Sequence, residues 1–314
     1  MDNPSSTSDS LLAGSSGGAA ELRGALFLVL EYLRLPELLT LRQVCRAYRD
    51  SIAADELIWR HISVEPPLNS RLTDDALLRI TSFTRGNLTS LALLDCRRIT
   101  DDGLLQVVNR NPSIKKLYIP GCSSLTPDGI VRVVKQLAEH NGYLECLRLQ
   151  GLHQIKAVHF HVLNSLLYQS NPRAASHPHF YRDFCSVRYN IDDGRPMDVD
   201  ICPKCNNVRM IFDCPREDCR MMRNKRNACR GCFLCIERCG ECGGCLDPEE
   251  VVEEIACLHL LCAGCWLHLP KCTTCNSPCC KQDAAAFGFS SADFALPTSS
   301  FGLSLLPTLK SCGI

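Results

Sequence analysis

The 314-residue sequence lacks an excess of either charge, a long hydrophobic run and a signal peptide. Its 34 Lys and Arg residues balance 34 Asp and Glu residues, which gives no general reason to expect a nucleic acid or an anionic membrane as partner. The best apolar run, residues 25–30, is far shorter than the roughly 20 residues that cross a bilayer. The N-terminus has neither the basic residues nor the apolar segment of a signal peptide. We therefore expect a soluble intracellular protein of the nucleus or the cytoplasm, without a membrane partner.

Conventional catalytic motifs are missing as well. The sequence contains no phosphate-binding loop, no zinc-protease helix and no confined pair of carboxylates. We therefore predict no catalytic residue and a protein that acts by binding.

Cysteine, by contrast, is abundant and unevenly placed. Of 23 cysteines, 17 lie between Cys202 and Cys280, whereas the first 201 residues contain five. In an intracellular protein such clusters serve as thiols or metal ligands rather than as disulfides. We therefore predict bound zinc, with disulfides and iron–sulfur clusters as the alternatives.

The clustered cysteines fall into pairs, most of them with two residues between the ligands. This spacing lets a tight turn aim two thiolates at one tetrahedral ion. Large apolar residues are scarce in this region, so zinc would contribute folding free energy on the order of 10 kcal/mol per site. Eight pairs suffice for up to four structural zinc ions and leave no open position for a catalytic water. The predicted pairs are Cys202/Cys205, Cys214/Cys219, Cys229/Cys232, Cys235/Cys239, Cys242/Cys245, Cys257/His259, Cys262/Cys265 and Cys272/Cys275.

A basic run accompanies these cysteines and allows nucleic-acid binding as an alternative function. However, a four-thiolate zinc site carries net negative charge, which nearby arginines can offset. No aromatic residues are interleaved with the run, and four glutamates follow it within residues 249–254. We favour charge compensation and do not expect a nucleic-acid partner. The basic residues are Arg216, Arg220, Arg223, Lys225, Arg226 and Arg230.

Residues 72–168 repeat a pattern that is typical of leucine-rich repeats in their cysteine-containing form. Residues 88–99 have the pattern Leu-x-x-Leu-x-Leu-x-x-Cys-x-x-Ile, which is echoed 26 residues later. A third copy starts at Leu144, and a partial copy opens the array. Each copy predicts a strand, a turn and a helix, with helices over residues 104–108 and 130–138.

Repeats of this kind stack and present a row of strands on a concave face. Strand alternation buries Leu91 and Leu93 and exposes the residues between them. We expect Cys96 and Cys122 to pack as small apolar residues in the turns. The exposed mixture suits the binding of an unidentified protein substrate, although so short a stack can also serve only to brace its neighbours. The predicted exposed residues are Ser90, Ala92, Leu94, Pro120 and Cys146, with Lys116, Tyr118, Arg148 and Gln150 as the predicted substrate-binding residues.

Three short helices are predicted before the repeats. Apolar residues at positions 26, 29, 30 and 33 form one helical stripe, Leu35-Pro36 interrupts it, and a second stripe covers residues 38–48. Asp55 is placed to cap a third helix that carries residues 57–59. So small a bundle needs a neighbour to bury its apolar faces.

Residues 28–48 resemble the second half of an F-box, and residues 57–59 resemble its closing helix. An F-box followed by leucine-rich repeats and a cysteine-rich region is similar to plant Skp-interacting F-box proteins. The resemblance implies a substrate receptor of an SCF-type ubiquitin ligase, which binds a Skp-family adaptor and, through it, a cullin. Burial against the first repeat is the alternative role of these apolar residues. The predicted adaptor-binding residues are Leu35, Pro36, Leu38, Leu41, Val44 and Trp59.

Residues 242–275 resemble a RING finger in ligand order and spacing. The resemblance implies two cross-braced ions. One set is Cys242, Cys245, Cys262 and Cys265, and the other is Cys257, His259, Cys272 and Cys275. RING fingers that recruit a conjugating enzyme usually have an apolar residue between the first two cysteines, where this chain has Gly243 and Gly244. Direct RING-type ligase activity is therefore an alternative to the receptor role.

Together these patterns predict a multidomain α+β protein with a small three-helix F-box, a short α/β leucine-rich-repeat solenoid and an irregular zinc-stabilised module. The predicted boundaries are a disordered arm over residues 1–20, the F-box over 21–66, the repeats over 67–168, a linker over 169–198, the cysteine-rich module over 199–280 and a disordered tail over 281–314.

Overall fold

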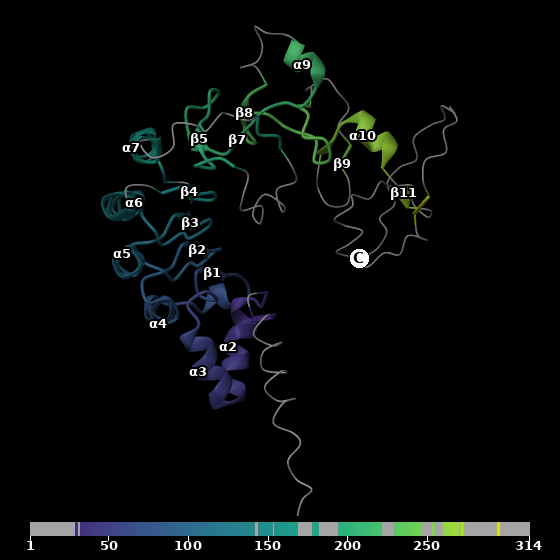
Figure 1. The fold of residues 1–314 in the computed structure, drawn as a ribbon. Helices are drawn as coiled ribbons and strands as arrows, with labels where there is room; N and C mark the ends of the chain where they lie inside the picture. The colour runs from purple at the N-terminus through teal and green to yellow at the C-terminus, as the bar shows by residue number, and fades with distance from the viewer. Residues whose placement is uncertain are drawn as a thin grey trace, which may run out of the picture.

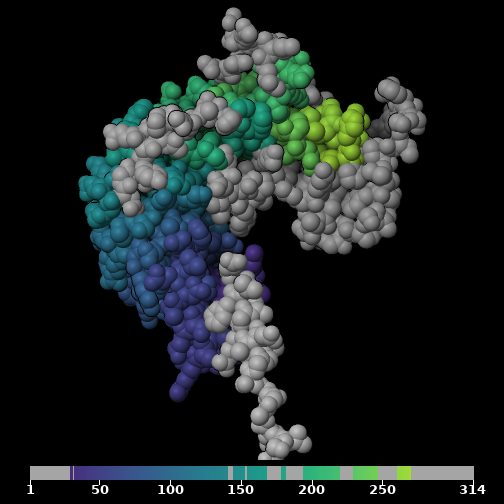
Figure 2. Space-filling view, viewed as in Figure 1, coloured from purple at the N-terminus to yellow at the C-terminus, as the bar shows by residue number. Residues whose placement is uncertain are grey.

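The fold is known from a computed structural model of the chain. It describes residues 29–30, 32–141, 144–152, 154–168, 178–181, 194–221, 229–246, 253–254, 260–269, 271–272 and 294–295. These residues form an arc, with a helix pair at one end, a parallel sheet backed by helices in the middle and the cysteine-rich region at the other end (Figure 1). In the space-filling view, the purple N-terminal helices and the yellow-green end of the cysteine-rich region lie at opposite ends of this arc (Figure 2).

Two helices, α2 (Leu35–Val44) and α3 (Arg46–Ala54), form the first described unit. At the start of α2, the backbone N–H of Arg34 donates to the Glu37 carboxylate at 2.8 Å. Cys45 ends α2 and caps α3, because its Sγ accepts a hydrogen bond from the backbone N–H of Tyr48. The two helices pack on each other and supply Leu35, Leu38 and Ile52 to the core.

The third predicted helix, over residues 57–59, is a turn instead. Asp55 still caps it, since its carboxylate accepts the N–H of Leu57 at 2.9 Å. Trp59 explains the difference: its ring is buried 4.9 Å from the Phe83 ring, and its Nε1 donates to the Ile52 carbonyl at 2.7 Å. These tertiary contacts pull the chain out of a helical path and join the helix pair to the repeats.

The four-stranded parallel sheet has the order β1-β2-β3-β4. Its strands are β1 (His61–Val64), β2 (Ser90–Leu93), β3 (Lys116–Tyr118) and β4 (Cys146–Arg148). The helices α4 (Asp74–Thr81), α5 (Asp101–Arg110), α6 (Pro127–Asn141) and α7 (Ala157–Tyr168) follow the strands in turn and line the outer side of the arc (Figure 1). Short 3-10 helices cover Leu68–Ser70 and Ser82–Thr84.

Equivalent leucines of the predicted repeat pair across the sheet. Leu91 lies opposite Leu117, and Leu117 opposite Leu147, so every copy contributes the same position to one buried row. Strand β1 was missed, because its sequence lacks the leucine spacing of the other copies and lies inside the predicted helical domain. Cys96 and Cys122 are fully buried in the turns, as the sequence predicted.

A hydrogen-bond ladder joins successive copies at the starts of their helices. Thr100 donates its backbone N–H and its hydroxyl to the Asp74 carboxylate, at 3.0 and 2.7 Å. Thr126 makes the same two bonds to Asp101, at 2.9 and 2.5 Å. A Cβ on Gly103 would lie 2.1 Å from the Asp74 Cγ, so glycine is required there for this close approach. Each contact therefore joins the threonine of one copy, followed three residues later by glycine, to the aspartate that follows the threonine of the preceding copy.

The cysteine-rich region is attached to the free edge of β4. Residues 196–198, at the end of the predicted linker, run along this edge, where the Leu147 N–H donates to the Pro196 carbonyl at 2.8 Å. The Asp198 carboxylate then accepts the N–H groups of Leu149 and Gln150, at 2.8 and 3.0 Å. Burial raises the pKa of Asp198, and the Leu149 N–H opposes that shift. One backbone carbonyl and one carboxylate thus accept the N–H groups at the edge of β4, where a fifth strand would otherwise pair.

Beyond this attachment the elements are very short. The antiparallel pairs are β5 (Asp200–Ile201) with β6 (Val208–Arg209), β7 (Ile211–Phe212) with β8 (Gly231–Cys232), β9 (Glu253–Glu254) with β10 (Leu260–Leu261), and β11 (Lys271–Cys272) with β12 (Phe294–Ala295). The helices are α9 (Glu217–Met221) and α10 (Ala263–His268). Strand β12 falls within the tail that was predicted to be disordered. Among the described helices, none has the length and hydropathy of a bilayer span.

Candidate metal centres

The first cysteine cluster joins two tight turns that lie far apart in the sequence. Cys202 and Cys205 flank the turn after β5, and Cys232 and Cys235 flank the turn after β8. Their four sulfur atoms lie within 4.8 Å of one another. The Cys232 N–H also donates to the Cys202 sulfur at 3.4 Å, as backbone amides commonly do toward a ligating thiolate. Both turns have the two-residue spacing of a tetrahedral site.

The second cluster contains Cys214, Cys219 and Cys245, whose sulfur atoms also meet the 4.8 Å limit. Cys229 completes it, because its Sγ lies 3.4 Å from that of Cys219 and 3.7 Å from that of Cys245. Four sulfur atoms thus converge from α9 and three separate loops. One ion at their centre would connect segments that otherwise share little apolar contact.

The third cluster comprises Cys239, Cys242, Cys262 and Cys265. The Cys242 and Cys262 sulfur atoms are 3.8 Å apart, and Cys262 caps α10 by accepting the N–H of Cys265. A hydrogen bond from the Cys242 thiol lowers the pKa of Cys239 to about 4. A thiol that ionises this readily suits a metal ligand, because the thiolate is the ligating form.

The observed grouping corrects three of the predicted pairs. Cys229/Cys232, Cys235/Cys239 and Cys242/Cys245 are each divided between two clusters. Six cysteines from residue 229 to residue 245 follow one another at intervals of three or four, so spacing alone allows two pairings. The fold selects Cys232/Cys235 and Cys239/Cys242, because these pairs flank tight turns.

The same grouping corrects the predicted RING ligands. Cys245 belongs to the second cluster, and Cys239 takes its place beside Cys242, Cys262 and Cys265. The ligand order of a RING finger's first ion is kept, but it starts one cysteine earlier, at Cys239 instead of Cys242. Cys257, His259 and Cys275 lie outside the described residues, as does the side chain of Cys272, so the fourth ion stays a prediction.

Arg238 provides a test of whether the clusters fit a metal ion. Its side chain is fully buried beside the second cluster and donates to the carbonyls of Phe212 and Cys229, at 2.8 and 2.5 Å. Burial lowers the pKa of Arg238, and the Cys214 and Cys245 sulfurs oppose that shift. A buried cation needs nearby negative charge. Four thiolates around one divalent ion leave two negative charges, whereas four neutral thiols leave none, so the residues fit a metal-bound cluster.

One residue of the predicted basic run, Arg230, has a structural role. Arg230 donates to both Asp213 carboxylate oxygens, at 2.9 and 3.0 Å, and to Asp200 at 3.2 Å. Its charge is therefore offset by carboxylates. We had expected the arginines of this run to offset the charge of the thiolates, and Arg230 differs from that expectation. Arg223, Lys225 and Arg226 lie outside the described residues.

The predicted substrate surface is largely covered. Tyr118 and Arg148 are only 4% and 5% exposed, while Lys116 and Gln150 are half-buried. Arg148 donates its Nη1 to the Arg195 carbonyl at 2.8 Å. Ala92, Leu94 and Cys146, also expected to be exposed, are buried. The prediction of an open strand face was wrong at these positions, because alternation along a strand cannot show that another segment packs over the face.

The predicted adaptor-binding residues divide into core and surface. Leu35, Leu38 and Trp59 are buried, Pro36 and Leu41 are half-buried, and only Val44 is well exposed, at 66%. Sequence reasoning missed two larger exposed groups, Tyr32 at 78% and Leu57 at 67%. Tyr32 lies next to Leu33 of the first helical stripe, and Leu57 lies in the predicted third helix, which is a turn in the structure, so helical periodicity did not select either side chain.

Comparisons with known families agree with both ends of this architecture. Residues 25–65 match the family described as F-box-like, and residues 198–274 match the family described as the At3g27290 F-box protein C-terminal domain. The first match covers the α2–α3 unit and β1, and the second covers the three cysteine clusters. The two matches define the class: a protein with an F-box at one end and a cysteine-rich domain known from F-box proteins at the other.

Three proteins of Arabidopsis thaliana are similar along most of the chain. F-box protein SKIP28 is 40% identical over 74% of this chain and 71% of its own length. F-box protein SKIP14 is 38% identical over 81% of this chain and 56% of its own length. F-box protein At3g27290 is 34% identical over 78% of this chain and 65% of its own length. The chain belongs to this family of plant F-box proteins, and it spans between about half and three quarters of the length of these relatives.

Proposed function

We propose that the chain is a substrate receptor of an SCF-type ubiquitin ligase in the nucleus or cytoplasm. Its F-box region binds a Skp-family adaptor, which connects it to a cullin, and the remainder of the chain holds a protein target. The observation that carries this proposal is the F-box-like match over residues 25–65, on a unit that leaves large apolar side chains exposed.

The exposed side chains suggest where the adaptor binds. Tyr32 and Leu57 line one hollow of about 530 Å³ together with Pro36, and Val44 is exposed at the end of α2. Aromatic and aliphatic groups of this size form the buried centres of interfaces. We therefore place the adaptor contact on Tyr32, Val44 and Leu57, while Leu35, Leu38 and Trp59 hold the F-box unit on the repeats.

The middle and the end of the chain have supporting roles in this proposal. We assign the stacked strand–helix units to leucine-rich repeats, on the basis of the paired leucines and the Thr–Asp ladder. We assign zinc to the three clusters, because sets of four sulfur ligands suit closed tetrahedral sites. Such ions stabilise the fold and take no part in catalysis, since four protein ligands leave no open position.

Adaptor binding can be tested with the full chain and a purified Skp-family protein. We expect binding in the micromolar range or tighter, and a loss of at least about 100-fold when Tyr32→Ala, Val44→Asp and Leu57→Asp are combined, since interface centres dominate affinity. Val158→Asp is the matched control, because Val158 is equally exposed but lies on α7. Absence of binding by the unaltered chain at micromolar concentration would contradict the receptor role.

Direct RING-type ligase activity is a second candidate, favoured by the order of Cys239, Cys242, Cys262 and Cys265. Against it, Gly240 and Glu241 occupy the positions between the first two ligands, where an apolar residue is usual in such ligases. We expect the full chain to produce no ubiquitin chains with a conjugating enzyme when adaptor and cullin are omitted. If the unaltered chain forms ubiquitin chains under these conditions and the Cys239→Ser variant does not, direct ligase activity would be favoured instead.

A further inference from the structure

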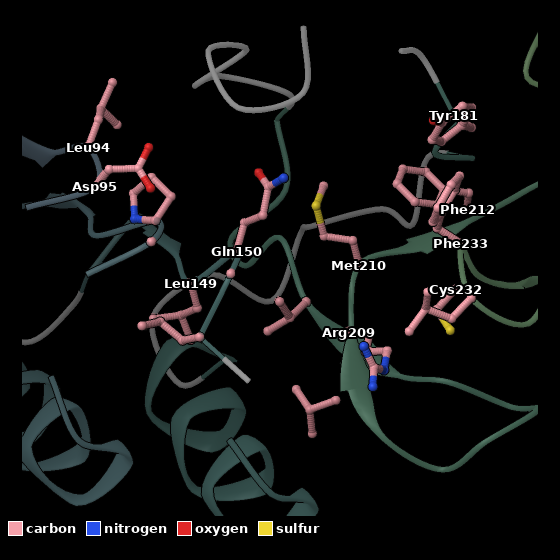
Figure 3. A pocket seen from close by; sticks show the side chains of 17 residues that line it. Leu94, Asp95, Leu149, Gln150, Tyr181, Arg209, Met210, Phe212, Cys232 and Phe233 are labelled. Carbon is pink, nitrogen blue, oxygen red and sulfur yellow. The ribbon is translucent and has the colours of Figure 1, made fainter. Parts of the chain in front are cut away.

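A cavity of about 330 Å³ lies where the repeats meet the cysteine-rich region. One wall is formed at the carboxyl ends of β2, β3 and β4, with Leu94, Pro120 and Leu149. The other wall comes from β6, β7 and the turn after β8, with Met210 and Phe212 (Figure 3). Two units that are distant in the sequence therefore build this cavity together.

The lining is mainly apolar and continues onto the surface. Phe212 and Tyr181 contact each other edge to face at 5.2 Å, and Tyr181 stacks on Phe233 at 5.6 Å. Phe233 and Leu234 are exposed, although they are the two residues between Cys232 and Cys235 of the first cluster. The turn between these two cysteines thus places two large apolar side chains at the rim of the cavity, Phe233 at 42% and Leu234 at 69% exposure.

A few polar groups are placed within this apolar setting. Gln150 lies between the two walls in the close view, and Asp95 and Arg209 lie at opposite sides (Figure 3). Arg209 is the one cationic side chain among the lining residues, and a guanidinium forms strong, charge-assisted hydrogen bonds with a carboxylate. The cavity thus combines apolar walls with one cationic donor group, the usual make-up of a specific ligand site.

We propose that this cavity binds a compact apolar group that carries a carboxylate, with Arg209 as the polar contact and Leu149, Met210, Phe212 and Phe233 as the apolar walls. The group has two possible sources, a free small carboxylic acid or the C-terminal residue of a protein target. The second source rests on the proposed receptor function, and the first does not. In both cases the first metal cluster positions part of the binding site.

Four probes separate the apolar from the polar contribution. They are 4-phenylbutyrate, its neutral analogue 4-phenylbutan-1-ol, the peptide acetyl-Gly-Gly-Phe with a free carboxylate, and the same peptide as an amide. Ligand-observed NMR with the full zinc-loaded chain measures their affinities. We expect 4-phenylbutyrate to bind with a dissociation constant on the order of a few millimolar or tighter, in keeping with ligands of this size.

Two variants test the assigned contacts. Arg209→Met should weaken both carboxylate probes about tenfold and leave the alcohol and the amide unchanged. Met210→Trp should reduce binding of all four probes by filling the cavity. Leu267→Ala, an exposed residue of α10, is the control and should change nothing. Zinc content and adaptor binding report that each variant is folded, and they keep a failure of this proposal separate from a failure of the receptor role.

The relative affinities of the peptide and of 4-phenylbutyrate separate the two possible sources of the carboxylate. Tighter binding of the peptide than of 4-phenylbutyrate assigns the site to the C-terminus of a protein target, and the reverse order assigns it to a free acid. The proposal is overturned if no probe binds the unaltered chain below about 10 mM, or if Met210→Trp and Arg209→Met leave all affinities unchanged while zinc content is preserved.

Discussion

The repeats and the cysteine-rich region are stabilised in different ways. The repeats share one continuous core, in which residues such as Leu91, Leu117 and Leu147 are fully buried, together with the Thr–Asp ladder between copies. The described part of the cysteine-rich region has two small apolar clusters of its own, and cysteines are members of both of them. The comparison shows that one chain combines a hydrophobic scaffold with a part that depends on ligand geometry.

Removal of metal should have the largest effect, because it should unfold the cysteine-rich region and leave the repeats folded. Each structural site contributes on the order of 10 kcal/mol, more than any single side chain in the repeats. We expect a strong chelator under reducing conditions to abolish amide-exchange protection in residues 200–269, while α4, α5 and α6 stay protected. Native mass spectrometry should find at least three zinc ions before treatment, and the same chelator saturated with zinc serves as control. Persistent protection in the metal-free chain would show that the clusters are not structural.

A pair of double variants tests how the cysteines are grouped. Cys242→Ser with Cys245→Ser should remove two ions, because the structure places these residues in different clusters. Cys214→Ser with Cys245→Ser should remove only one. The RING pairing predicts the opposite numbers, so metal counting by native mass spectrometry decides between them. Cys45→Ser, at an exposed cysteine outside all clusters, should leave the zinc content unchanged.

A smaller effect is expected within the repeats. Gly103→Ala brings a Cβ to 2.1 Å from the Asp74 Cγ, so the carboxylate must move and the bonds to Thr100 are lost. We expect a loss of about 1–3 kcal/mol in the free energy of unfolding, measured by urea denaturation, with zinc content unchanged. Gly264→Ala is the matched helical control, because a Cβ there meets no atom within 4 Å. Equal effects of the two substitutions would argue against a role for the ladder.

The repeats were the more predictable part of the fold. Hydrophobic spacing located β2, β3, β4 and the helices α5 and α6, and it also explained why Cys96 and Cys122 are buried. It underestimated the helices α5 and α6, whose polar first turns carry no apolar signal. It also missed β1, which belongs to the sheet through its pairing with β2 rather than through its own sequence pattern.

The binding surfaces were predicted less well, for a common reason. A side chain's position on a strand or helix specifies a face, but another segment can cover that face. Residues 195–198 do so for Arg148, and Trp59 turned from a proposed contact into a core residue through Phe83 and Ile52. The cavity beside Arg209 has no signal in the sequence at all, because its two walls come from separate units.

The sequence by itself determined the order of the units, the repeated strand–helix pattern and the presence of a cysteine-rich, metal-competent region. These features depend on spacings of a few residues, which local geometry translates directly into helices, strands and tight turns. Only the tertiary structure decided which cysteines share a cluster, which faces stay open and where a cavity forms. Those outcomes depend on distances between segments that are 20 to 50 residues apart, and many chain paths satisfy the same local spacing.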